Sequence, residues 1–380
     1  MPGQPGREYR QKKMNQLETL KTPYVSIIIV TWNATEDIEE TLDSLEEQTY
    51  KNSEIILVDS ASSDNTVELV RSKYPSVHII ESADNIGYRR GNRLGMNNAN
   101  GEHIVICNDD VRLDPNCIGE LVKTLEDNPT TGLATPVIMN YYEPDLISAA
   151  GNTLHYTGMT GHSLARDSGR EYAFEIDSDL SAVSGCCFII RREAMVELGG
   201  FSNDFDALDT GWHAASEDAD LSLRARMRGY GITLVPSALM YHKHDGKRPV
   251  TPNLFASAEW ARYLLVFRNY ETRTLILMIP AFMMLELMSI VFSAMKGREW
   301  LRSKLLVYRW IFKNFSTLRK MRSEVQDRRT VPDSTVLPKL DPTINRARLV
   351  GLGPFGKLIE KTSNAVFLLY HRFLCFAVSL

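Results

Sequence analysis

The sequence has few of the features that mark disulfide-rich, zinc-binding or nucleic-acid-binding proteins. Its five cysteines form no C-x-x-C pair and no zinc-ligand spacing, so we expect reduced thiols in a cytoplasmic setting. Charges of opposite sign nearly balance, at a formal net charge of −4, and give no reason to expect nucleic acid as a partner. The polar start lacks the apolar segment of a secretory signal, and we expect residues 1–22 to form a flexible leader.

Strands and helices alternate from residue 25 onward, which predicts an α/β fold with a mostly parallel, Rossmann-like central sheet flanked by helices. Strands are expected at Val25–Val30, Glu54–Val58, Val77–Ile80 and His103–Cys107. Helices are expected at Glu36–Glu47, at Val67–Tyr74 with Asp64 as its N-cap, and at Gly87–Asn98. The next block, 130–245, is less regular, and its clearest elements are a strand at Cys186–Ile190, a helix after Arg192 and a polar helix near Glu217–Arg228.

The composition changes after residue 250. Leu275–Met295 is apolar apart from Glu286 and contains Pro280, which favours a re-entrant or interfacial helix over a simple span. Lys296–Arg329 carries 11 Lys/Arg against 3 Asp/Glu, interleaved with aromatic and aliphatic residues. A basic, amphipathic segment beside an apolar one is typical of an anionic membrane surface. The alternative is a helical subdomain that packs on the catalytic core.

Three polar residues, Asn108, Asp109 and Asp110, directly follow the apolar run Ile104–Cys107. A buried parallel strand has this apolar pattern, and ligands of open α/β sheets bind at the carboxyl ends of strands. Adjacent carboxylates repel each other unless a cation lies between them, and hard divalent cations prefer oxygen ligands. The pattern predicts a metal site that holds a phosphorylated substrate. An acidic turn after a strand is the alternative.

Two other strands end in polar side chains at the same predicted edge. Thr31 and Asn33 follow the first strand, and Asp59 ends the second, where a carboxylate accepts the N–H of a nucleobase or a ribose hydroxyl. The alternative for Asp59 is a turn-forming role. The loop after Asp59 contains no G-x-G-x-x-G, which argues against a dinucleotide-binding fold.

The segment Asn85–Asn92 contains Asn85, Gly87 and Asn92 and is expected to open a helix whose backbone donors lie near a diphosphate. A loop with a capping glycine is the alternative.

Together these segments resemble the family 2 glycosyltransferases of the GT-A fold, from about Val25 to about His244. The matching pieces, in order, are Ser-Ile-Ile-Ile-Val-Thr-Trp-Asn (26–33), Val-Asp-Ser-x-Ser-x-Asp (58–64), Asn-x-Gly-Tyr (85–88), Asn-Asp-Asp (108–110), Ser-Gly-Cys-Cys-Phe (184–188), Gly-Gly-Phe (199–201) and Ser-Glu-Asp-Ala-Asp-Leu-Ser-Leu-Arg (216–224). The subgroup that this chain resembles most is the rhamnosyl- and galactofuranosyltransferase-like enzymes of envelope glycan synthesis.

The resemblance implies roles for the residues of the sheet edge. Asp59 contacts the base of a nucleotide-sugar donor, with Thr31 and Asn33 in the same pocket, and Asp109 faces the ribose. Asp110 matches the carboxylate that holds Mg²⁺ or Mn²⁺ against the diphosphate. Asn108 departs from the acidic first position of the family's Asp-x-Asp pattern and ligates with less charge.

The resemblance also assigns roles in the second half of the chain. Asp218 of the Glu217-Asp218 pair matches the general base, since an inverting transfer needs a carboxylate that deprotonates the acceptor hydroxyl. Because the two residues are adjacent, we expect them on different helix faces. An acidic helix start that favours the helix dipole is the alternative.

His242 matches a third metal ligand at the end of a strand, with a polar surface histidine as the alternative reading. Further candidate contacts to the acceptor or the diphosphate are Trp212, Glu217, His244, Lys247 and Arg248.

These patterns predict an inverting, metal-dependent glycosyltransferase with a lipid-linked glycan acceptor, at the cytoplasmic face of the cell membrane. UDP or dTDP is favoured as the donor nucleotide. A polyprenyl-phosphate sugar synthase, a non-catalytic GT-A-fold assembly partner and a Rossmann dehydrogenase are the alternatives. The expected organisation is a glycosyltransferase domain at 23–250, a basic and apolar helical region at 251–330, and a linker with a C-terminal apolar helix at 331–380.

Overall fold

Apolar, β-branched residues form the central strands, as the sequence predicts. In the computed structural model, which describes residues 22–162, 166–174, 178–202, 216–243, 250–344 and 353–380, β1 (Val25–Thr31) is almost entirely buried. It lies between two parallel neighbours, β2 (Ser53–Asp59) and β4 (His103–Cys107). Because parallel strands place their carboxyl ends at one edge, the polar residues after β1, β2 and β4 share that edge.

The main sheet has the strand order β3-β2-β1-β4-β10-β6-β11-β5, with β7 paired to β6. Its remaining strands are β3 (His78–Glu81), β5 (Val111–Leu113), β6 (Thr131–Asn140), β7 (Ile147–Ala150), β10 (Cys187–Arg191) and β11 (Gly231–His242). A separate hairpin consists of β8 (Asn152–Leu154) and β9 (Thr160–His162). From β3 to β4 all pairs are parallel, whereas β10 runs antiparallel to both β4 and β6.

The reversal at β10 brings two distant segments together. Cys187 pairs with Cys107, so the turn before β10 lies at the carboxyl end of β4. There the backbone N–H of Asn108 donates to the Cys186 carbonyl at 2.9 Å. The strand and helix rhythm of the first hundred residues gives no sign of this antiparallel insertion.

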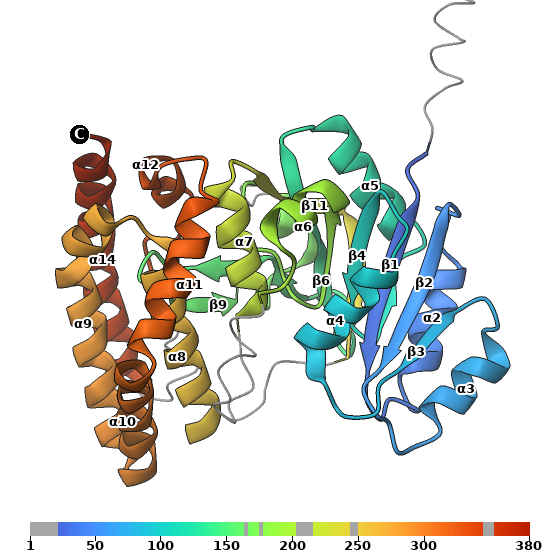
Figure 1. The fold of residues 1–380 in the computed structure, drawn as a ribbon, viewed down its shortest axis with the longest axis horizontal. Helices are drawn as coiled ribbons and strands as arrows, with labels where there is room; N and C mark the ends of the chain where they lie inside the picture. The colour runs from blue at the N-terminus through green and yellow to red at the C-terminus, as the bar shows by residue number, and fades with distance from the viewer. Residues whose placement is uncertain (1–21, 163–165, 175–177, 203–215, 244–249, 345–352) are drawn as a thin grey trace, which may run out of the picture.

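Helices cover both faces of the sheet (Figure 1). Those of the sheet region are α2 (Ile38–Glu46), α3 (Thr66–Lys73), α4 (Gly87–Asn98), α5 (Cys117–Asp127), α6 (Arg192–Leu198), α7 (Glu217–Met227) and the 3-10 turn η1 (Arg170–Phe174). The helices expected from the sequence are present, with ends that differ by at most two residues. The N-cap of α3 is Asn65 and not Asp64. Asp64 instead accepts from the Thr66 N–H at 3.1 Å and the Thr35 N–H at 3.2 Å, which ties the loops after β1 and β2 together.

The C-terminal part is helical and packs on the catalytic part (Figure 1). It comprises α8 (Pro252–Asn269), α9 (Thr272–Lys296), α10 (Arg298–Lys313), α11 (Phe315–Asp327), α12 (Asp333–Val336), the 3-10 turn η3 (Leu337–Lys339) and α14 (Gly353–Ser379). Ala219 and Leu223 of α7 share one core with Leu265 of α8 and Phe367 of α14. Among the described residues, α9 is the one helix long and apolar enough to cross a membrane. The domain boundaries drawn from the sequence stay a prediction, and residues 1–21 lie outside the described part.

Candidate active site

The carboxyl ends of β1 and β2 carry two buried polar residues, Thr31 and Asp59. The two are register partners. Asp59 Oδ2 accepts from the Ser62 N–H at 3.0 Å. Asp59 Oδ1 is buried and has no hydrogen-bond partner among the described residues. A buried carboxylate oxygen without a donor is costly, so Oδ1 is suited to receive a donor from a ligand.

Asn33 joins the loop after β1 to the loop after β2. Its φ is +53°, and its Oδ1 accepts from the Ser63 N–H at 2.8 Å. Its own N–H donates to Ser62 Oγ at 2.8 Å. The amide oxygen of Asn33 therefore holds the loop after β2, the same loop whose Ser62 N–H donates to Asp59.

The start of α4 is organised by Ser60, a residue that the motif reading did not single out. Ser60 Oγ accepts from the N–H groups of Ile86 and Gly87, at 2.8 and 3.1 Å, and donates to Asn85 Oδ1 at 3.1 Å. The first two amides of this turn are thus engaged within the protein. Asn92 is buried, and among the described residues its Oδ1 has no hydrogen-bond partner.

Asn108, Asp110 and His242 come together at the carboxyl edge, as the resemblance implies. His242 ends β11, which pairs with β5 directly after Asp110. His242 Nε2 lies 3.1 Å from Asp110 Oδ1 and 3.5 Å from Asn108 Nδ2. A half-turn of the Asn108 amide exchanges its nitrogen for its oxygen.

The distance between Asp110 and His242 fits a metal site. Two ligands on adjacent corners of a magnesium octahedron, each at about 2.1 Å, are about 3 Å apart. The described residues contain no group of three His, Cys, Asp or Glu side chains that suits a metal, so the set depends on the Asn108 amide.

The protonation of this pair follows from its contact. Burial lowers the pKa of His242, but the Asp110 hydrogen bond outweighs it and the Cys186 thiol adds to the rise, to about 10. Burial also raises the pKa of Asp110, while His242 lowers it, and the net shift is downward. A proton and a cation therefore compete for Nε2, because only the neutral imidazole ligates.

Asp109 faces a different environment from Asp110. Burial raises its pKa to about 6 against the lowering effect of the Thr31 hydroxyl, and the charge of Asp110 raises it further.

A cavity of about 320 Å³ connects the metal candidates to α7. Asn108 and His242 line one part of it, and Glu217 and Asp218 line another. Asp218 Oδ2 accepts from Asn152 Nδ2 at 2.7 Å and from the Gly185 N–H at 3.0 Å, while Oδ1 accepts from the Ala219 N–H at 2.8 Å. Burial raises the pKa of Asp218, and these hydrogen bonds oppose the rise without cancelling it.

Glu217 lines the same cavity as Asp218. Both belong to the first turn of α7, whose end faces the cavity, so both side chains reach it. Glu217 Oε2 is buried and has no hydrogen-bond partner among the described residues. Burial and the neighbouring Asp218 raise the pKa of Glu217 to about 7.

Sequence reasoning missed several residues that line the cavity, among them the polar residues Asn152 and Arg166. Asn152 lies at the start of the β8–β9 hairpin, 66 positions from the Asp218 that it contacts, and Arg166 follows the hairpin. Neither belongs to a motif, so no sequence signal pointed to them. Trp212, His244, Lys247 and Arg248 lie outside the described residues.

The polar residues lie at the carboxyl edge of the sheet, where open α/β sheets bind their ligands. Residues 26–199 match the family model of glycosyl transferase family 2. Two solved structures share the fold: GalNAc-T7 with UDP, GalNAc and Mn²⁺ (TM-score 0.51, 16% identity, 64% of this chain and 48% of that chain) and Staphylococcus aureus TarS 1–349 with UDP (TM-score 0.50, 14% identity, 92% and 91%). The GT-A fold expected from the sequence is thereby confirmed.

Curated relatives of known and unknown activity each match 57 to 62% of this chain. An N-acetylglucosaminyl-diphospho-decaprenol L-rhamnosyltransferase of Mycobacterium tuberculosis is 25% identical over 62% of this chain and 81% of its own length. The poly-beta-1,6-N-acetyl-D-glucosamine synthase of S. aureus is 23% identical over 57% of this chain. An uncharacterized protein of Sinorhizobium fredii, y4gI, is 28% identical over 60% of this chain. The chain spans about half of the synthase and a quarter of y4gI.

Proposed function

We propose that this chain is an inverting, metal-dependent glycosyltransferase. It takes a sugar from a nucleotide-diphosphate donor and transfers it to a hydroxyl of a lipid-linked glycan, at the cytoplasmic face of the cell membrane, in the synthesis of envelope glycans. The observation that carries the proposal is the single cavity that Asn108 and His242 share with Glu217 and Asp218. Its volume would hold a sugar between the candidate metal ligands, next to which the diphosphate would lie, and the candidate base.

We assign the base of the donor nucleotide to Asp59, at the end of β2. Its unpaired Oδ1 would accept the imide N–H of uracil or thymine, which favours UDP or dTDP. Both structural neighbours were solved with UDP, which agrees with this assignment. Asp109, which follows the same strand end as Asn108, would face the ribose.

A divalent cation, Mg²⁺ or Mn²⁺, would be held by Asp110 and His242, with the amide oxygen of Asn108 as a weaker ligand. When bound, it supplies positive charge to the departing diphosphate. The neighbour GalNAc-T7 was solved with Mn²⁺, which supports such a cofactor.

Asp218 is proposed as the general base. One carboxylate oxygen of Asp218 accepts the proton of the acceptor hydroxyl, and the acceptor oxygen attacks the anomeric carbon from the side opposite the diphosphate. The bond to the diphosphate breaks as the new glycosidic bond forms, which inverts the anomeric centre. Glu217, with a pKa near 7, would hydrogen-bond a sugar or acceptor hydroxyl from the same helix turn.

The lipid-linked acceptor is proposed by analogy with the M. tuberculosis relative, whose name specifies a diphospho-decaprenol acceptor. A polyprenyl-phosphate sugar synthase remains the second candidate, since the site would serve it as well. The two differ in the need for a base, because a phosphate acceptor needs little deprotonation.

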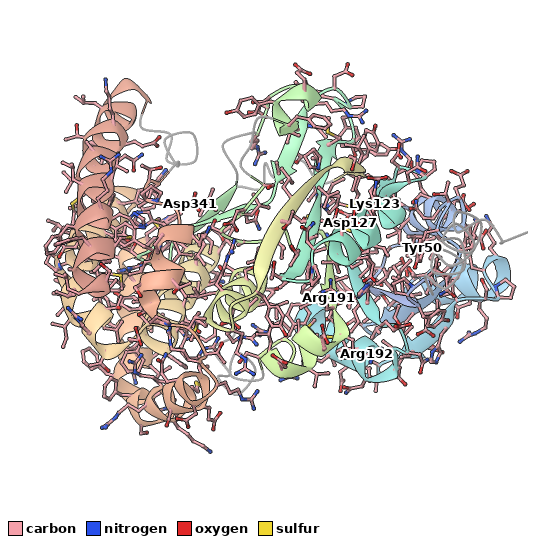
Figure 2. All side chains as sticks on the ribbon, turned by 90° about the horizontal axis from the view of Figure 1, so that it is seen from above. Tyr50, Lys123, Asp127, Arg191, Arg192 and Asp341 are labelled. Atoms are coloured by element: carbon pink, nitrogen blue, oxygen red, sulfur yellow. The ribbon has the colours of Figure 1, made fainter. Side chains whose placement is uncertain are left out.

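The test is the Asp218→Asn variant, assayed with membranes as the source of acceptor. A hydroxyl acceptor predicts a loss of transfer of about 10²- to 10⁴-fold, while thermal stabilisation by UDP or dTDP with Mn²⁺ is kept. Asp127→Asn, an exposed carboxylate at the end of α5 (Figure 2), is the matched control. Full activity of Asp218→Asn would favour the phosphate acceptor. No stabilisation by any nucleotide, with or without metal, would overturn the proposal.

A further inference from the structure

Two C-terminal helices, α9 and α14, lie side by side at the edge of the molecule farthest from β3 (Figure 1). Arg273 donates to the Ala377 carbonyl at 2.8 Å, and Tyr370 Oη donates to the Leu277 carbonyl at 2.6 Å. Because these partners occur in opposite order along the two helices, α9 and α14 are antiparallel. Their packing leaves an outer face on each.

The outer face of α9 is apolar over its whole length. Between Arg273 and Lys296 every exposed side chain of this helix is apolar, and the large ones recur every three or four residues: Ile276, Ile279, Met283, Leu287, Ile290, Val291 and Met295. Leu287, near the middle, is 63% exposed. Water-facing helices normally carry polar side chains at such positions.

The outer face of α14 continues this apolar surface. Its exposed large apolar side chains are Leu358, Ile359, Val366, Leu369, Phe373 and Phe376, with Leu380 directly after the helix, and its exposed polar residues are Lys361, Thr362, Arg372 and Ser379. We call the exposed apolar side chains of α9 and α14 together the outer apolar face. Two antiparallel stripes make it broader than a single helix allows.

The inner side of α9 is fixed to charged groups of its neighbours. Glu286 accepts from Arg262 of α8 at 2.5 Å and lies 2.7 Å from Lys304 of α10. Glu259 contacts the same two cations, so two carboxylates balance two cations in a buried cluster. If α9 crossed a bilayer, α8 and α10 would have to enter the hydrocarbon with these charges.

α8 is in turn fixed to the catalytic part. Arg268 forms a buried ion pair with Asp220 of α7, and Tyr270 Oη donates to the Tyr156 carbonyl at 2.8 Å. The helix that binds α9 from the inside therefore belongs to the same rigid packing as the candidate base. This attachment holds α9 along the surface of the protein.

The helices beside the outer apolar face are basic. Exposed residues of α10 include four cations, Arg298, Arg302, Arg309 and Lys313, against one carboxylate, Glu299. Leu305, Leu306 and Phe312 are exposed on the same helix. Apolar side chains next to cations match the boundary between acyl chains and anionic headgroups.

We propose that α9 and α14 lie in the plane of an anionic phospholipid membrane, with the outer apolar face inserted at the headgroup boundary, and that α9 does not cross it. This inference rests on and sharpens the membrane location in the proposed function. The occupant of the face is the lipid surface, and the cations of α10 contact its headgroups. The catalytic cavity is then held at a fixed distance from a lipid-linked acceptor.

The first test is sedimentation of the full chain with vesicles of phosphatidylcholine, with and without phosphatidylglycerol. Binding should need the anionic lipid and weaken at high salt. Met283→Asn with Leu287→Asn, and separately Leu369→Asn with Phe373→Asn, should each weaken binding about tenfold or more. Val196→Asn, a 71% exposed apolar residue on α6, is the matched control and should bind normally.

The second test separates lying from crossing. Single cysteines at Ile276, Leu287 and Met295, in a chain with Cys186→Ser and Cys375→Ser, carry an environment-sensitive label that brominated lipids quench. Lying in the plane predicts one shallow depth for all three positions. A deep Leu287 label with the other two at opposite surfaces would overturn the proposal.

Two further outcomes would also overturn it. These are failure of the protein to bind any vesicle, or a dimer that protects the outer apolar face and excludes lipid. Thermal stabilisation by UDP with Mn²⁺ is measured on each variant. If neither the unaltered chain nor any variant is stabilised by the nucleotide, the proposed function is refuted. If the unaltered chain binds the nucleotide but no vesicle, only the membrane geometry is refuted.

Discussion

At the scale of single residues, the surroundings of Asp218 distinguish its two oxygens. Oδ2 receives two donors, from Asn152 and Gly185, whereas Oδ1 receives one, from Ala219. A carboxylate oxygen with fewer donors keeps a lone pair for an incoming proton. Asn152 is therefore a positioning residue, which sets the orientation of the candidate base and stabilises its charged form.

We expect Asn152→Ala to change the pH profile of transfer. Loss of a donor favours the protonated form, so the pKa of Asp218 rises further and the acid limb of kcat/KM moves to higher pH. Loss of a hydrogen bond to a charged group corresponds to about a tenfold loss of kcat/KM at pH values below the pKa of the base, with recovery in alkaline buffer. The measurement is kcat/KM between pH 5 and 9.

The control is Asn98→Ala, which removes an exposed amide that bonds only its own helix at Leu94. It should leave the profile unchanged. An equal loss at every pH in Asn152→Ala would mean that Asn152 supports the fold and does not act on the base.

At the scale of elements, the buried ionic cluster of α8, α9 and α10 joins the helices that form the outer apolar face to the rest of the protein. Lys304 is fully buried and Glu286 is 6% exposed. Charges at such positions are tolerated only when they are paired. The cluster fixes how the three helices pack and so where the apolar side of α9 points.

Glu286→Gln should destabilise the protein, because it leaves two cations facing one carboxylate. Breaking a buried pair by removing one partner costs about 3 to 5 kcal/mol, and Lys304→Met should cost a similar amount. The double variant restores the charge balance and should lose less than the sum of the two. Urea unfolding provides the free energies.

Glu299→Gln, an exposed carboxylate on α10, is the control for this cycle and should stay within about 0.5 kcal/mol of the parent. Strictly additive losses in the double variant would show that Glu286 and Lys304 are not coupled.

At the scale of the whole molecule, the helical part and the catalytic part share a core. Besides the Asp220–Arg268 pair, Asp341 bridges them: its carboxylate accepts from Ser181 Oγ at 2.5 Å and from the Leu154 N–H at 2.8 Å. Figure 2 shows Asp341 at the junction between the C-terminal helices and the sheet region. Leu154 follows Asn152 in β8, so this junction reaches the strand that positions the candidate base.

We therefore expect a chain that ends at residue 250 to be insoluble or partly unfolded. Truncation exposes Ala219, Leu223 and Met227, which the C-terminal helices cover, and it leaves Asp220 without its cation. Solubility, circular dichroism and nucleotide binding measure the effect. A soluble, cooperatively folding 1–250 chain that binds UDP with Mn²⁺ would show that the catalytic part is independent.

The sequence by itself determined the first half of the fold and the class of the protein. Strands β1 to β4 and helix α4 follow from apolar runs and helix periodicity, and these are local signals. Asp59, Asp110 and Asp218 stand out because they follow or begin such elements in a family-like order. The candidate ligands Asn108, Asp110 and His242 do meet, because β5, which directly follows Asp110, pairs with β11 at His242.

Only the tertiary structure decided the rest. The antiparallel β10, the contact of Asn152 with Asp218 and the engagement of the α4 amides by Ser60 all depend on contacts between distant segments, which leave no periodic trace. The same holds for α9. Its composition allowed a bilayer span, but Glu286, the single charge in its apolar run, points inward to Arg262 and Lys304, and this directs the apolar side outward.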